Sequence, residues 1–182
     1  MECPKHLLST IDLTKVLEFP IGTIYDDINE TLITEYVDRL DIYFSQRGIE
    51  EVGSHTWRLP RELVRNAYTS GRGKQSIVTL GLFLSPESVV VGCNDGGDYF
   101  MDPQIKSLWE TKTPIASRGM QYDQEGHFVS GYNNGNKMIY GMTDEIFIDT
   151  KTGTFFGMFN PRIYLLSGSE LEDIFKKRSQ KN

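Results

Sequence analysis

A carboxylate and a carboxamide stand four residues apart just after Pro60. On a helix, Glu62 and Asn66 lie one turn apart on the same face, about 40° apart around the axis. The opposite face of that helix is apolar and consists of Leu63, Val64, Ala67 and Tyr68. The spacing therefore predicts one packed face and one face that presents an acid–base group beside a metal-ligating amide. An ordinary solvated helix face has the same pattern.

A second acidic group follows an apolar strand. The run Val89–Val91 leads into the segment NDGGD at residues 94–98. An aspartate at the end of a strand, followed by glycines, can direct its carboxylate at a ligand while the backbone approaches closely. The alternatives are an ordinary turn and a calcium loop through Asp95, Asp98 and Asp102, but that loop lacks the EF-hand spacing and its glutamate.

A third segment, GYNNGN at residues 131–136, precedes an apolar helical stretch that contains Met138, Ile139 and Met142. Glycine-rich turns that open onto a helix offer backbone N–H groups and a positive dipole end to phosphates. The segment matches neither the P-loop nor the dinucleotide fingerprint. It is therefore a weak signal when taken alone.

The periodicity of apolar residues predicts the elements that position these segments. Strands are expected within residues 5–19, and an Asp27–Glu30 capping box should open a helix that ends at Gly48. A helix from Pro60 to Gly71 precedes a hairpin of strands 76–84 and 88–94. The remaining expectations are a helix from Asp102-Pro103, a hairpin of 145–150 with 154–159, and a last helix near Ser169. This order predicts an α+β two-layer sandwich.

Composition limits the class of protein. The 182 residues suit a single domain, and the net charge of −6 argues against a dedicated nucleic-acid binder. No apolar run is long enough for a membrane span, and the first residues lack the apolar core of a signal peptide. Two cysteines, Cys3 and Cys93, fit a reducing compartment, so we expect a cytoplasmic protein without a structural zinc site.

The order and spacing of these motifs resemble the GHKL superfamily of ATP-binding domains, which includes gyrase, histidine kinases and anti-sigma-factor serine kinases. Residues 62–66 match the ExxxN pattern of the family's N-box, and Asp95 opens a DxGxG-like box 29 residues after Asn66. A hairpin lies between the two boxes, and a loose second glycine box follows at 131–137. The segments TDEI at 143–146 and GTFF at 153–156 are similar to the family's closing strands. The resemblance covers roughly residues 25–160.

The resemblance implies a mixed, mostly antiparallel sheet that helices cover on one face. It also implies that the chain binds ATP and Mg²⁺. Asp95 would accept a hydrogen bond from the adenine amino group, Gly97 would let the backbone pass close to the base, and Thr154 would reach the adenine end. Asn66 would coordinate Mg²⁺ and Glu62 would activate the attacking water.

Backbone amides at Gly135 and Asn136 would hold phosphates, with Lys137 beside them, although a solvent-facing lysine is an equal alternative. Residues 99–135 would form a mobile lid within the single domain 1–182. Two departures concern this lid: Tyr99 stands where the last glycine of DxGxG belongs, and the second glycine box is altered.

Among family members, the size of the chain is most similar to stand-alone anti-sigma-factor serine kinases. The resemblance thus implies slow ATP hydrolysis or transfer of the γ-phosphoryl group to a regulatory protein partner. Two alternatives remain open: a nucleotide-binding module without chemistry, and a protein-interaction module without a nucleotide site.

Overall fold

The computed structural model describes residues 1–20, 25–46, 55–70, 77–113, 121–122, 128–130 and 134–160. Its centre is a five-stranded sheet in the order β1-β2-β3-β7-β6, and every pairing in it is antiparallel. The strands are β1 Leu13–Pro20, β2 Ile77–Leu84, β3 Val89–Asn94, β6 Glu145–Asp149 and β7 Thr154–Phe159. A separate two-stranded sheet joins β4 Gln121–Tyr122 to β5 Phe128–Ser130.

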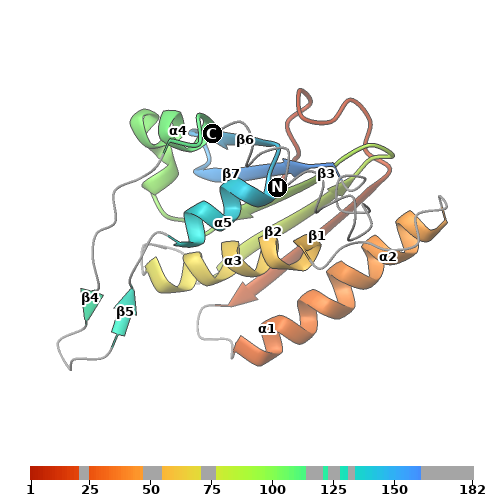
Figure 1. The fold of residues 1–182 in the computed structure, drawn as a ribbon, viewed down its shortest axis with the longest axis horizontal. Helices are drawn as coiled ribbons and strands as arrows, with labels where there is room; N and C mark the ends of the chain where they lie inside the picture. The colour runs from red at the N-terminus through yellow and green to blue at the C-terminus, as the bar shows by residue number, and fades with distance from the viewer. Residues whose placement is uncertain are drawn as a thin grey trace, which may run out of the picture.

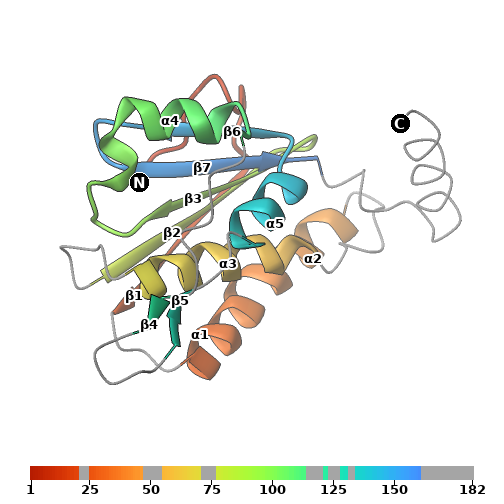
Figure 2. The same ribbon diagram turned by 60° about the vertical axis from the view of Figure 1, so that its left-hand side comes forward.

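Helices cover one face of the five-stranded sheet (Figures 1 and 2). They are α1 Tyr25–Leu32, the π-helical turn η1 Ile33–Val37, α2 Asp38–Ser45, α3 His55–Ser70 and α5 Asn134–Met142. The 3₁₀ turn η2 Tyr99–Met101 and helix α4 Pro103–Glu110 pack against β6. The α+β sandwich expected from the sequence is therefore confirmed.

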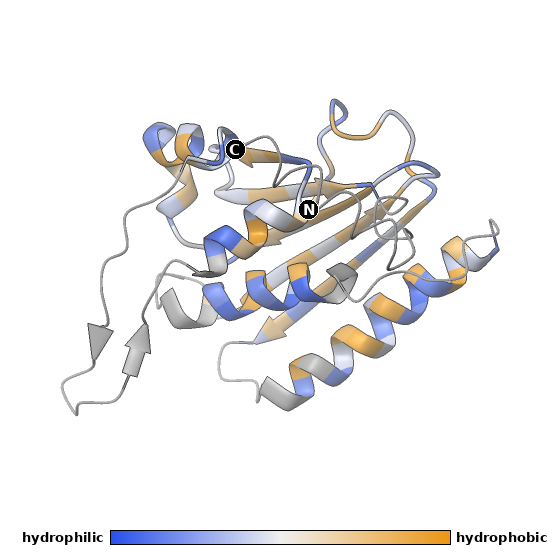
Figure 3. Cartoon of the chain, in the orientation of Figure 1, coloured by the Kyte–Doolittle hydropathy of each residue, from blue (hydrophilic) through white to orange (hydrophobic). Residues whose placement is uncertain are grey.

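Alternation along the strands divides their side chains between two apolar clusters. On the helix-covered face, the larger cluster joins strand residues such as Leu80, Val91 and Phe155 to buried residues of the helices. On the outer face, Phe83, Val90 and Phe156 pack against Leu7 and Leu8 of the N-terminal segment. Figure 3 shows hydrophobic residues along the strands and on helix sides that face them. Both faces of the central strands are thus buried.

Several sequence predictions are confirmed. The two hairpins form as β2–β3 and β6–β7, and the expected helical stretch forms as α5, which begins within the glycine-rich run, at Asn134. Asp102 caps α4, because its Oδ1 accepts a hydrogen bond of 2.8 Å from the backbone N–H of Gln104. In the segment 5–19, where one or two strands are expected, the structure has one strand. It begins at Leu13 and extends to Pro20, one residue beyond the expected segment.

Two predicted helix starts are wrong. Helix α3 begins at His55, so Pro60 lies inside it rather than at its first position. Leu59 and Pro60 are both buried, and this packing extends the helix toward the N-terminus despite the proline. Likewise, α1 already includes Tyr25, so Asp27 is an exposed residue of its first turn and not its cap.

Other expectations fall outside the described residues. These are the helix ends expected at Gly48 and Gly71 and the last helix expected near Ser169. Most of the part of the predicted lid that follows residue 113 also lies outside the described residues. The first part of that lid segment consists of η2 and α4, and β4 and β5 belong to its later part. Among the described residues, no helix is long and apolar enough to cross a membrane.

Candidate functional site

Helix α3 carries the predicted acid–base group, Glu62, and the predicted amide ligand, Asn66, and lies between other elements of the fold. It packs against β2 and β3 below and against α1 and α5 beside it. Glu62 is only 8% exposed, and its Oε1 lies 3.6 Å from the guanidinium of Arg65. Asn66, one turn later, is half-buried. Glu62 therefore does not belong to a solvated face, because elements beside α3 cover much of its side chain.

The turn after β3 is built from two successive side-chain-to-backbone hydrogen bonds. The N–H of Gly96 donates to Asn94 Oδ1 at 2.8 Å, and the N–H of Gly97 donates to Asp95 Oδ1 at 2.9 Å. Gly96 has a φ of 69°, a conformation that favours glycine. Asp95 is half-buried, and its second carboxylate oxygen has no hydrogen bond to the residues that the structure describes. That oxygen can accept a hydrogen bond from a ligand.

Asn94 joins this turn to the β6–β7 turn. Its Nδ2 donates to the carbonyl oxygen of Thr152 and to Thr154 Oγ1, both at 2.8 Å. The hydroxyls of Thr152 and Thr154 lie 2.8 Å apart, and Thr152 Oγ1 donates to Asp149 Oδ2 at 2.7 Å. Because Thr152 uses its proton on Asp149, Thr154 must donate to Thr152 while it accepts from Asn94. The Thr154 proton is therefore committed within this network.

Strand alternation places Asn94 and Thr154 on the face of the sheet opposite to that of Cys93 and Phe155. Cys93 and Phe155 are the last paired residues at this end of β3 and β7, and Asn94 and Thr154 are the next residues along. Cys93 and Phe155 belong to the core on the helix-covered face, so Asn94 and Thr154 point to the outer face. The structure thus brings Asp95 and Thr154 to the same end of the sheet, but the residue that contacts Thr154 is Asn94.

The two turns also touch through glycine. A Cβ atom on Gly153 would lie 2.9 Å from the carbonyl oxygen of Gly97, and Gly153 has a φ of 68°. Both the close approach and the left-handed backbone require glycine at this position. Gly97, which the resemblance would place close to a nucleotide base, is buried, and its carbonyl oxygen approaches the β6–β7 turn.

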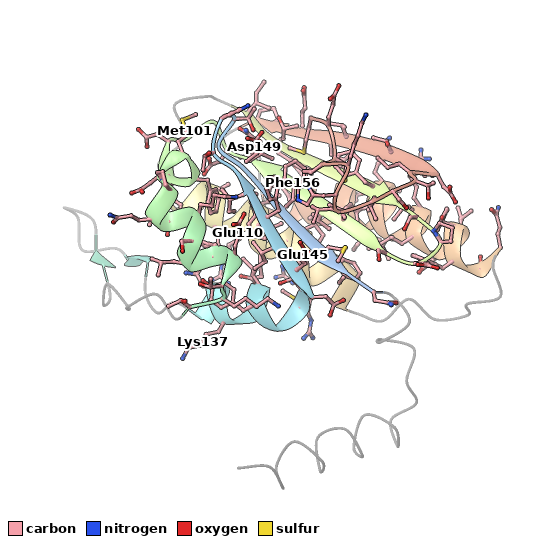
Figure 4. All side chains as sticks on the ribbon, turned by 90° about the horizontal axis from the view of Figure 1, so that it is seen from above. Met101, Glu110, Lys137, Glu145, Asp149 and Phe156 are labelled. Atoms are coloured by element: carbon pink, nitrogen blue, oxygen red, sulfur yellow. The ribbon has the colours of Figure 1, made fainter. Side chains whose placement is uncertain are left out.

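The first turn of α5 contains the predicted phosphate-binding residues. Gly135, Asn136 and Lys137 all lie within it, on a helix that packs against α3. Asn136 is half-buried, whereas Lys137 is exposed, and its side chain points away from the protein in Figure 4. The structure therefore places the helix start beside α3 but leaves Lys137 in solvent.

Sequence reasoning missed an aromatic cluster next to the Asp95 turn. Trp109 contacts the rings of Phe100, Tyr140 and Phe155 at centroid distances of 5.3–5.6 Å, and its Nε1 donates to Tyr99 Oη at 3.4 Å. Burial, with a smaller contribution from Tyr99, raises the pKa of Tyr140 to about 12. The cluster attaches η2 and α4 to β7. The closely spaced aromatic residues at 99, 100 and 109 are the feature of the sequence that could have predicted it.

Among the described residues, no three His, Cys, Asp or Glu side chains are grouped so that they could hold a metal ion. No protein-family model matches the chain, and no curated protein matches it significantly. The assignment to a family therefore depends on the motifs and their placement.

Proposed function

We propose that this chain binds Mg-ATP as a GHKL-type domain and hydrolyses it slowly or transfers its γ-phosphoryl group to a protein partner. The observation that carries the proposal is the burial of the Glu62 carboxylate, one turn from Asn66, on a helix that packs against β3. Strand β3 leads directly to Asp95, whose free oxygen is an acceptor. An acid–base group, an amide ligand and an acceptor are thus carried by two elements that pack against each other, α3 and the end of β3.

The residues suit the parts of such a nucleotide. Asp95 Oδ2 would accept from the adenine amino group, and Asn66 would supply an amide oxygen, a ligand that Mg²⁺ accepts together with phosphate oxygens and water. The helix start at Gly135 and Asn136 would donate N–H groups to phosphates. When bound, Mg²⁺ neutralises phosphate charge.

Glu62 is the candidate for orienting the nucleophile. Its carboxylate is mostly shielded from water but lies near a single described cation, Arg65, at a distance longer than a hydrogen bond. Such a group can accept a proton from a water molecule or a hydroxyl group. A positioned base and fixed charges are what phosphoryl transfer requires of a protein.

The first test is thermal unfolding with and without Mg-ATP. At about 100 times the dissociation constant, ATP should stabilise the fold by roughly 2.7 kcal/mol, which raises the midpoint by about 5–10 °C for a domain of this size. Asp95→Asn should remove this shift, because it replaces an acceptor by a group that can present a donor. Glu87→Gln, an exposed acid-to-amide change in the β2–β3 turn, is the matched control. No shift for the wild type with any nucleotide would refute the proposal.

A second test separates binding from chemistry. Glu62→Ala should abolish ATP turnover and leave ATP affinity nearly unchanged, as measured by calorimetry and phosphate release. Equal loss of affinity in Glu62→Ala and Asp95→Asn would contradict these roles. Retained binding without release or transfer in the wild type would instead favour a nucleotide-binding module without chemistry.

A further inference from the structure

The two edge strands of the five-stranded sheet, β6 and β1, differ in whether side chains bind their outward-facing backbone groups. At the β6 edge, Glu110 Oε1 accepts from the backbone N–H of Ile148 at 2.8 Å, and Lys106 Nζ donates to the carbonyl oxygen of Ile148 at 2.8 Å. Figure 4 shows Glu110 between α4 and β6. Side chains of α4 therefore bind the outward-facing backbone groups of β6 and close this edge to another strand.

The β1 edge is not closed in this way: among the described residues, no side chain binds the backbone of β1 between Leu13 and Phe19. Strand β1 pairs with β2 in an unbroken register over all eight residues, and its proline is the last residue, Pro20. Its central residue on the outer face, Val16, is opposite Gly81 of β2 and is 39% exposed. A long, regular and exposed edge strand is a template for pairing with another chain.

The one lysine on β1 is directed to the helix-covered face, where an ion pair holds it. Lysines at strand edges commonly prevent pairing by their charge. Here Lys15 Nζ lies 2.6 Å from Glu35 Oε2 on the π-helical turn η1, over the helix-covered face. Tyr43 likewise donates to Asp12 at 2.7 Å. These contacts tie the helical segment 25–45 to β1 through side chains.

We propose that the β1 edge binds β1 of a second copy of this chain, antiparallel, and joins the two sheets in a two-fold symmetric dimer. This inference is independent of the nucleotide proposal. A two-fold axis normal to the joined sheet keeps each side chain on its own face, so only registers that place a residue opposite itself are possible.

Charge selects among these registers. Centring on Lys15 would place two ammonium groups opposite each other, and centring on Glu18 would do so with two carboxylates, which is destabilising. Centring on Leu17 would place the charged Glu18 side chain opposite the apolar Val16 side chain. Centring on Val16 pairs the two exposed valines and places Thr14 opposite Glu18, with no like charges opposed. The strand is therefore self-complementary about Val16.

The first measurement is the molar mass of the wild type by light scattering and sedimentation over a range of concentrations. The wild type should be a dimer. Val16→Lys should be a monomer, because it places two ammonium groups at the two-fold axis, whereas Met138→Lys on the exposed side of α5 should remain a dimer. Circular dichroism and thermal unfolding of both variants check that they fold.

A cysteine scan tests the register in a Cys3→Ser background, in which the remaining Cys93 is buried. Directly opposite residues of antiparallel strands have Cα atoms about 4.5–5.5 Å apart, within the range of about 4.4–6.8 Å that a disulfide spans. Val16→Cys should therefore form a covalent dimer under mild oxidation. Glu18→Cys alone should not, because the two copies would lie about 14 Å apart along the strands.

Three outcomes would overturn the inference. One is a wild type that stays monomeric at every concentration. Another is a dimer that persists in folded Val16→Lys, which would place the interface elsewhere. The third is cross-linking of Glu18→Cys in preference to Val16→Cys. A covalent Val16→Cys dimer together with monomeric Val16→Lys supports it.

Discussion

Asn94→Ala is expected to destabilise the end of the sheet where the candidate site lies. The substitution removes three hydrogen bonds of 2.8 Å: two from Nδ2 to the β6–β7 turn, and one from the N–H of Gly96 to Oδ1. These bonds connect β3, the Asp95 turn and Thr154. Since strands β3 and β7 pair only up to Cys93, the Asn94 side chain continues their connection into the turns.

The magnitude follows from these three bonds. A typical intramolecular hydrogen bond contributes about 0.5–1.5 kcal/mol, which sums to about 1.5–4.5 kcal/mol. Asn94 is half-buried, so water can solvate some of the freed groups, although Thr154 is only 4% exposed. We expect a loss of about 2–3 kcal/mol, which lowers the unfolding midpoint by about 4–12 °C in a domain of this size.

Urea and thermal unfolding measure this loss. Thr152→Val is the matched control, because it removes the hydroxyl that bonds Thr154 and Asp149 but keeps the backbone carbonyl that accepts from Asn94. It should cost about 1 kcal/mol. The reasoning would be refuted if Asn94→Ala were within about 0.5 kcal/mol of wild type, or if Thr152→Val cost as much.

Substitutions at Gly153, Tyr36 and Glu110 test other features, and Gly141→Ala and Glu110→Gln are their comparisons. Gly153→Ala should cost about 2–3 kcal/mol in urea unfolding, from its left-handed φ and the approach to the Gly97 carbonyl, whereas Gly141→Ala in α5, with open space around it, should stabilise by about 0.5–1 kcal/mol. Tyr36→Phe should gain about 1 kcal/mol, because the fully buried hydroxyl has no partner among the described residues. Burial also raises the pKa of Tyr36 in the folded state above the unfolded value of about 10. Ionisation of Tyr36 therefore leaves the free energy of unfolding unchanged below about pH 10 and lowers it as the pH rises further. Tyr36→Phe should lose less stability at alkaline pH than the wild type. Glu110→Ala should cost about 1–2 kcal/mol and increase light scattering, since a backbone N–H of edge strand β6 loses its acceptor, while Glu110→Gln keeps an acceptor.

Much of the fold was predictable because local signals agreed with the tertiary structure. Two apolar runs flanking a short turn gave each hairpin, and Asp102 followed by proline gave the start of α4. Helix starts failed where packing opposed the local signal. Buried Leu59 and Pro60 extend α3 beyond the position that proline usually marks, and α1 likewise already includes Tyr25.

The candidate site was less predictable because its contacts cross between strands. A helical wheel identified Glu62 and Asn66 as neighbours, but it could not show that Glu62 is buried, because burial depends on the elements that pack against α3. The contact between Asn94 and Thr154 depends on the β3–β7 register. A register shift of one residue would reverse which side chains face the helices, so periodicity within one strand could not reveal it.

This register also gives Asp95 and Thr154 different parts in the nucleotide proposal. A residue that contacts the base must present a free polar group, and Asp95 does so with one carboxylate oxygen. Thr154 is buried, faces the outer side of the sheet and has its proton committed to Thr152. Its role in the structure is to hold the β6–β7 turn against the Asp95 turn. The proposal therefore depends on Glu62, Asn66 and Asp95, and loss of Thr154 should weaken a nucleotide site only through the shape of the turn that carries Asp95.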